Sequence, residues 1–155
     1  MMAKGDSRAA SPNATLLTEI VLLVFRVNGR LLSAGDRLVG DLGLTSARWQ
    51  MLGAVALSDH PRTAPLLAAR MGMTRQAAQK QLDLLMEDGL VAAEANPGHA
   101  RSPLYVLTRK GTSVYAATER LQAAWANRIA GSLAIRDLAI AKQLLDDLSN
   151  RLNAS

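Results

Sequence analysis

Residues 63–90 read TAPLLAARMGMTRQAAQKQLDLLMEDGL, and this stretch decides the fold of the chain. Thr63 can cap a short helix. That helix ends in a tight turn at Gly72, because glycine adopts backbone conformations that are costly for other residues. Thr74 can then cap a longer helix, predicted over 75–88. Two helices joined by a short turn that contains glycine form a helix-turn-helix, so the stretch predicts this motif.

The second helix of the motif has a predicted inner side and a clear end. Its buried stripe is expected at Ala78, Leu82 and Leu85, which are spaced by four and three residues. Gly89 can end the helix, with Leu90 as the hydrophobic residue that accompanies such a stop. The polar residues between these positions must then face away from the core.

Two short apolar runs, 90–93 and 104–107, follow and predict a β-hairpin. Pro97-Gly98 lies between them, and this pair suits the centre of a type II turn. A hairpin directly after the second helix makes the motif winged. The predicted fold class is therefore mainly α with a small β-hairpin wing, a winged helix-turn-helix.

Long helices flank this lobe. The first is predicted over about 15–33. It is apolar on both faces, so it must be covered on both sides, and in a chain of 155 residues a second subunit can supply that cover.

Thr45 or Ser46 can cap the next helix. After the wing, Thr108 can cap a helix that runs toward Ala130, with a break at Gly131-Ser132. The last helix carries apolar residues three and four apart, typical of helix–helix packing: Leu138, Ala141, Leu145, Leu148 and Leu152.

The charge of the chain favours an anionic partner. The formal net charge is +5, which suits nucleic acid or an acidic membrane surface. Segment 60–82 contains no Asp or Glu but holds four cations: Arg62, Arg70, Arg75 and Lys80. Because this acid-free segment coincides with the helix-turn-helix, nucleic acid is the favoured partner.

Composition also excludes several classes of protein. The chain has no cysteine, which rules out disulfides, thiolate metal sites and cysteine redox switches. The longest apolar run near the N-terminus, 20–25, is too short to span a bilayer. Glu19 next to it argues against a signal peptide. We therefore expect a cytoplasmic protein with no membrane partner.

The second helix presents the candidate DNA contacts. With its apolar stripe inside, Arg75, Gln76, Gln79 and Lys80 point outward near its N-terminal end. In the major groove, arginine can bridge guanine O6 and N7, and glutamine can pair with adenine. Thr74 and the helix N-terminus can hold a phosphate. This prediction requires these side chains to be neither buried nor paired with carboxylates; the alternative interpretation is an ordinary solvated face.

The hairpin tip offers Arg101, which can lie in the neighbouring minor groove, where a narrow groove concentrates negative potential. A solvated arginine on a loop is the alternative. For His99, exposure without a role is expected, and His60 is expected to be structural or exposed at a helix end.

In this order and spacing, several pieces of the sequence resemble the MarR family of regulators, the multiple antibiotic resistance type. The resemblance covers residues 44–111. Leu44-Thr45 with Trp49 and Leu52 is similar to the start of the family's second helix. Similar pieces follow at the third helix and turn, at the end of the recognition helix and after the wing: LLAARMGM (66–73), LMEDGLV (85–91) and LTRKG (107–111).

The resemblance implies a homodimeric transcription regulator with interlocked terminal helices. Its two winged lobes would bind a pseudo-palindromic operator in double-stranded DNA, as a repressor that a small-molecule effector can release. By position, Gln76, Ala77, Gln79 and Lys80 match the family's base- and phosphate-contacting residues, and Arg101 matches its wing arginine. The family often has Asp where this chain has His99, and a small polar pair where this chain has Gln76-Ala77.

The resemblance also implies a division of the chain. Residues 1–13, which are small, polar and charged, are expected to be a flexible tail. Residues 14–155 are expected to form a single domain. Within it, 44–111 would be the winged helix-turn-helix lobe, and 14–40 and 112–155 would be dimerisation helices.

Two other functional classes are less well supported. For an enzyme, the two histidines lie far apart in the predicted elements, and the sequence has no phosphate-binding glycine loop or metal-ligand spacing. We therefore expect no catalytic residue, no cofactor and no metal. The second is a winged helix that contacts protein instead of DNA. A PadR-like regulator also stays open, because long flanking helices fit both families.

Overall fold

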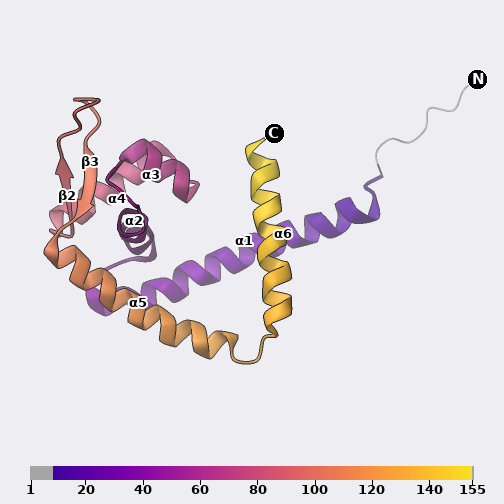
Figure 1. Ribbon diagram of the computed structural model, residues 1–155. Coiled ribbons are helices and arrows are strands. Elements are labelled where there is room, and N and C mark those ends of the chain that lie inside the picture. The colour runs from indigo at the N-terminus through magenta and orange to yellow at the C-terminus, as the bar shows by residue number, and fades with distance from the viewer. Residues whose placement is uncertain (1–8, 155) are drawn as a thin grey trace, which may run out of the picture. The chain divides into compact units, whose positions relative to one another are not determined.

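The structure is a computed structural model that describes residues 9–154 (Figure 1). Part of the expected tail, residues 1–8, lies outside the described residues. The elements in chain order are α1 (Pro12–Val39), the 3-10 helix η1 (Gly40–Leu42), α2 (Ser46–Ala56), β1 (Arg62–Thr63), α3 (Ala64–Met71), α4 (Arg75–Glu87), β2 (Val91–Glu94), β3 (Leu104–Leu107), α5 (Arg109–Ala130) and α6 (Ile135–Asn153). The predicted fold class, mainly helical with a β-hairpin wing, is confirmed.

The chain divides into two compact units. The first extends through Thr118 and the second begins at Glu119, so α5 starts in one unit and ends in the other. In the second unit a turn separates α5 from α6, where the Leu133 N–H donates to the Ala130 carbonyl. The predicted break at Gly131-Ser132 is thus confirmed. Among the residues described, no helix is both long and apolar enough to cross a bilayer.

Helix α1 is longer than predicted at both ends. It begins at Pro12, because proline suits the first helical turn and the Ser11 hydroxyl accepts a hydrogen bond from the Ala14 N–H at 3.2 Å. It also continues past Ser33 to Val39. Residues 12 and 13, expected in the tail, are therefore helical.

Contacts with α2 explain why α1 extends beyond Ser33. The Ser46 hydroxyl donates to the Leu32 carbonyl at 2.7 Å, and the Ser46 N–H donates to Asp36 Oδ1 at 2.7 Å. Gly35 permits this approach, since a Cβ there would lie 2.1 Å from Ser46 Oγ. The cap of α2 is Thr45, whose hydroxyl accepts from the Arg48 N–H. The last turns of α1 are therefore held by contacts that are remote in sequence.

The helix-turn-helix forms as predicted. Gly72 ends α3 in the left-handed conformation with φ 62°. Thr74 caps α4 and accepts a hydrogen bond from the Ala77 N–H at 3.1 Å. Thr63 occupies the N-cap position of α3, but its side chain makes no capping hydrogen bond. The turn and the cap together fix where α4 begins.

The end of α4 and the start of α5 meet at a junction of residues 88–90 with residues 108–111. Gly89 adopts φ 70°, and the Leu90 N–H donates to the Leu85 carbonyl, which completes the predicted helix stop. The Leu90 carbonyl accepts from the Thr108 N–H at 3.0 Å, and the Thr108 hydroxyl donates to the Gly89 carbonyl at 2.7 Å. Thr108 also caps α5 by accepting from the Gly111 N–H at 2.9 Å. Four chain segments are thus joined at one point: the end of α4, the residue before β2, the residue after β3 and the first turn of α5.

Strands β2 and β3 form the predicted hairpin, with Val91 opposite Leu107 and Glu94 opposite Leu104. A third strand, β1, was not predicted. It pairs with β3, and the sheet order is β1-β3-β2. Two residues are too few to show a strand periodicity, so the sequence carries no signal for β1.

The prediction of a type II turn at the hairpin tip was wrong. That turn needs a positive φ at Gly98, whereas the positive φ angles in the described chain occur at Gly43, Gly72 and Gly89. The tip is organised by Asn96. Its side-chain oxygen accepts from the Gly98 N–H at 3.1 Å, and its side-chain nitrogen donates to the Ser102 carbonyl at 2.8 Å. An asparagine that supplies these bonds makes the left-handed glycine unnecessary.

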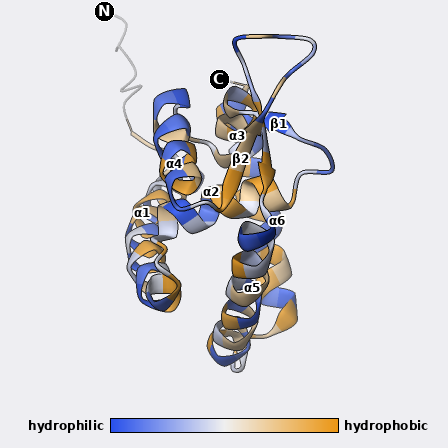
Figure 2. Ribbon diagram, turned by 90° about the vertical axis from the view of Figure 1, so that its left-hand side faces the viewer, coloured by the Kyte–Doolittle hydropathy of each residue, from blue (hydrophilic) through white to orange (hydrophobic). Residues whose placement is uncertain are grey.

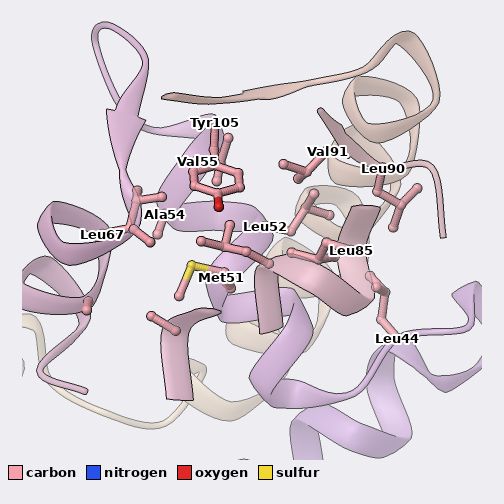
Figure 3. Packing of buried hydrophobic residues seen from close by; sticks show 14 of the residues in the cluster. Leu44, Met51, Leu52, Ala54, Val55, Leu67, Leu85, Leu90, Val91 and Tyr105 are labelled. Atoms are coloured by element: carbon pink, nitrogen blue, oxygen red, sulfur yellow. The ribbon is translucent and has the colours of Figure 1, made fainter. Parts of the chain in front are cut away.

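The core sets the orientation of α4. Ala78, Leu82 and Leu85 are fully buried, as predicted. They belong to one cluster with side chains from α2, α3, β2 and β3, part of which Figure 3 shows around Leu52, Val55 and Tyr105. Because one side of α4 is fixed in this cluster, the opposite side is held toward solvent.

Candidate nucleic-acid interface

The solvent side of α4 carries most of the residues expected to contact DNA. Thr74, Arg75, Gln76, Ala77 and Lys80 are exposed. The side chains of Arg75, Gln76 and Lys80 make no hydrogen bond or ion pair with the rest of the described chain. Two cations and one amide are therefore available to a ligand at the N-terminal end of the helix, where the helix dipole also favours an anion.

Gln79 differs from the prediction. It is half-buried at the edge of α4, and its side-chain nitrogen donates to Asp83 Oδ1 at 2.8 Å and to the Tyr105 hydroxyl at 3.1 Å. Gln79 therefore fails the requirement that the contact residues be free of carboxylates, whereas Gln76 and Lys80 meet it. The spacing of four residues between Gln79 and Asp83 on one helix was a signal for this pair in the sequence. The contact with Tyr105 had no such signal, because Tyr105 lies on β3, 26 residues away in the chain.

The wing carries Arg101 beyond the paired part of the hairpin, in the loop that extends away from the helices of the first unit (Figure 1). Arg101 is exposed and has no ion-pair partner in residues 9–154. His99 is exposed too, as predicted, and its backbone closes the two turns of the tip. The hydrogen bonds of Asn96 to Gly98 and Ser102 tie together the two sides of the loop that carries Arg101.

The cations of the acid-free segment are not equivalent. Arg62 is paired with Asp59 at 3.0 Å, and this hydrogen bond lowers the pKa of the Asp59 carboxyl below its ordinary value. Arg70 donates to the Leu57 carbonyl at 3.3 Å. Arg75 and Lys80 are the members of the set with no such partner in the described part of the chain. The segment therefore offers fewer free cations than its sequence suggests.

Asp88, at the C-terminal end of α4, is compensated by contacts that the sequence did not reveal. Arg48 of α2 forms an ion pair with Asp88 at 2.7 Å, and Lys110 of α5 donates to the Asp88 carbonyl at 2.8 Å. An arginine compensates an acid at this end, where a negative charge would repel phosphates. The free positive charge of α4 is thus confined to its first turns.

The exposed cations of α4 and the wing suit a DNA duplex. Within residues 9–154, no group of three or more acidic or histidine side chains is placed to hold a metal ion. An α-helix fits the major groove of DNA, and an arginine on an adjacent hairpin can reach the backbone or the minor groove. An exposed helix-turn-helix and a wing, both with unpaired cations, define the class of winged-helix DNA-binding regulators.

The comparisons with known proteins agree. The family model described as the MarR family matches residues 42–102. The chain belongs to the MarR family of transcriptional regulators. An uncharacterised protein of Mycobacterium tuberculosis (strain H37Rv) is 41% identical over 105 residues, which is 67% of this chain and 72% of that protein.

Solved structures share the fold over most of the chain. The MarR-family regulator AbsC of Streptomyces coelicolor superposes with a TM-score of 0.79 at 19% identity, covering 96% of this chain and 100% of AbsC. The transcriptional regulator PA3341 gives a TM-score of 0.78 at 26% identity, with coverages of 88% and 99%. CouR of Rhodococcus jostii RHA1, bound to p-coumaroyl-CoA, gives a TM-score of 0.71 at 23% identity, covering 92% of this chain and 93% of CouR.

Proposed function

We propose that the protein is a homodimer that binds a pseudo-palindromic operator in double-stranded DNA and represses transcription. The observation that carries the proposal is the set of exposed, unpaired cations at the start of α4 together with Arg101 on the wing. If this were an ordinary solvated face, there would be no reason for cations without acidic partners to occur on both α4 and the wing. A winged helix that binds only protein is not favoured for the same reason, and the family match is to MarR and not to a PadR-like family.

Each exposed residue has a proposed role. Arg75 and Gln76 contact base edges in the major groove. An arginine can donate to guanine O6 and N7, and a glutamine amide can donate to adenine N7 while its oxygen accepts from the N6 amino group. Lys80 binds a phosphate as a point charge. Thr74 and Ala77, at the capped N-terminus of α4, let the backbone approach a phosphate. Arg101 enters the minor groove.

The terminal helices support the homodimer. Helix α1 carries a long series of apolar side chains exposed in the single chain: Leu16, Leu17, Leu22, Leu23, Val24, Phe25, Val27, Leu31 and Leu32. Orange residues recur along α1 in Figure 2. Apolar surface of this extent marks an interface. We accordingly propose that 44–111 is the DNA-binding lobe, and that 14–40 and 112–155 supply the dimerisation helices of a single domain.

A small-molecule effector is part of the proposal. The neighbour CouR was crystallised with p-coumaroyl-CoA bound. In this chain, a cavity of about 410 Å³ in the first unit lies beside the junction of residues 88–90 with 108–111, with Asp88 and Lys110 in its lining. This volume lies in the range of small-molecule sites. We further propose a cytoplasmic location and no enzymatic activity, because a repressor acts by occupying DNA.

Replacing Lys80 or Arg101 with alanine should weaken DNA binding without changing the fold, because both side chains are exposed and unpaired. Each lost phosphate contact should lower the slope of log K against log salt by about one unit. The measurement is a titration of a duplex, enriched from a random pool by the wild-type protein, at several salt concentrations.

Arg37→Ala is the control, since it removes the same charge from an exposed site near the end of α1. A Lys80 or Arg101 variant that matches wild type at every salt concentration would remove that residue from the interface. If no duplex is enriched at all, the proposed DNA-binding function is wrong.

A further inference from the structure

The hydrogen bonds of Gln79 fix the orientation of its side-chain amide. An ionised carboxylate can only accept hydrogen bonds, so the group that faces Asp83 Oδ1 at 2.8 Å must be the amide nitrogen. The same nitrogen donates to the Tyr105 hydroxyl at 3.1 Å. A side-chain amide has two N–H hydrogens, and these two bonds use both.

The group that Gln79 retains for a ligand is therefore its carbonyl oxygen, an acceptor. The Asp83 carboxylate, which is exposed one turn further along α4, is also an acceptor. Side by side, these two groups form what we call the acceptor patch, defined by Gln79 Oε1 and the Asp83 carboxylate. The buried Tyr105 ring holds the hydroxyl in place, because the ring belongs to the core cluster.

The acceptor patch discriminates among bases in the major groove. Guanine presents two acceptors there, and thymine presents a carbonyl oxygen and a methyl group, so both lack a donor for the patch. Adenine presents an N6 donor beside its N7 acceptor. The donor suits one acceptor of the patch, but N7 then faces the other acceptor of the patch, which is unfavourable. Cytosine presents its N4 donor and no acceptor of its own in the major groove, so on this base the patch meets only a donor.

We infer that Gln79 and Asp83 together select a cytosine at one operator position in each half-site, with Tyr105 as the positioning residue that holds the Gln79 amide. This inference rests on the proposed DNA-binding function and refines its specificity. It also reverses the expectation from sequence, since an unrestrained glutamine pairs with adenine through one donor and one acceptor.

The test is a binding-site selection from random duplexes, done in parallel for wild type and for variants. Asp83→Ala combined with Tyr105→Phe frees both amide hydrogens. Asp83 is exposed and phenylalanine keeps the buried ring, so the fold should persist, which circular dichroism would verify. The preferred base at that position should change from cytosine to adenine, with about a two- to tenfold change in the ratio of affinities, the effect of one hydrogen bond.

Two single variants complete the design. Gln79→Ala should weaken the cytosine preference at that position and leave the others unchanged. Gln81→Ala is the matched control, because Gln81 lies on the same helix, outside the hydrogen-bond network and outside the proposed DNA contacts; it should leave the cytosine position intact. Two outcomes would overturn the inference while DNA binding stands. In the first, Gln79→Ala leaves every base preference unchanged. In the second, Gln79→Ala relaxes the preference at one position, but the base that wild type prefers there is adenine, guanine or thymine. If wild type enriches no duplex, the proposed function fails and the inference with it.

Discussion

Replacing Gly111 with alanine is expected to destabilise the protein by roughly 3 kcal/mol, at the upper end of typical overpacking costs. A Cβ at this position would lie 1.9 Å from the Leu90 carbonyl oxygen and 2.9 Å from the carbonyl carbon. These are backbone atoms, and they have no freedom to move aside. The Leu90 N–H is bonded to the Leu85 carbonyl and the Leu90 carbonyl to the Thr108 N–H. Thermal and urea unfolding at a fixed protein concentration would measure the loss.

Gly53→Ala is the matched control for this prediction. Gly53 also lies within a helix, but a Cβ there would meet Tyr115 Cε2 at 3.7 Å, an ordinary van der Waals distance. Alanine is the better helix former by roughly 0.5–1 kcal/mol, so this variant should equal or exceed wild type in stability. The close packing of α5 on Leu90 would be disproved by a Gly111→Ala protein that unfolds at the same urea concentration as wild type.

The double substitution Leu22→Asp/Phe25→Asp is expected to convert the proposed dimer to monomers and to weaken operator binding by a factor on the order of 10²–10⁴, the contribution of bivalent attachment. In the single chain these side chains are 60% and 70% exposed. The change therefore costs the folded monomer little, whereas two carboxylates in an apolar interface are strongly unfavourable. Sedimentation velocity and a duplex titration would measure the two effects.

Arg26→Ala is the control for this substitution, because it alters an exposed polar residue on the same helix. A deletion of the residues before Val27 gives an independent check. It removes part of α1 that contributes no buried residue, since the buried positions of α1 are Gly35 and Val39. A folded truncation that still sediments as a dimer would show that α1 is not the interface.

The sequence predicted the elements whose signals are local. The end of α3 and both ends of α4 follow from Gly72, Thr74 and Gly89, because caps and left-handed stops depend on adjacent residues. The buried stripe of α4 was also correct, because its period of three and four residues is visible in the sequence alone.

Most of the features that were missed depend on contacts between distant residues. The start of α1 at Pro12, by contrast, had a local signal in Ser11 and Pro12. The extension of α1 past Ser33 depends on Ser46, and the strand β1 depends on pairing with β3. The same reason explains the candidate site. The exposure of Lys80 follows from helical periodicity, but the restraint on Gln79 requires Tyr105 to be placed beside it by the sheet.

The junction of residues 88–90 with residues 108–111 has a consequence for operator length. It ties the last turn of α4 to both roots of the hairpin through hydrogen bonds to main-chain carbonyls. We therefore expect a constant span between the base pair that α4 is proposed to contact and the one that Arg101 is proposed to reach. Inserting one base pair between these two points shifts one of them by about 3.4 Å along the duplex. It also rotates that point by roughly 35° around the axis, given 10–10.5 base pairs per turn. Half-sites that are one base pair longer or shorter should therefore be rejected even when every contacted base is retained.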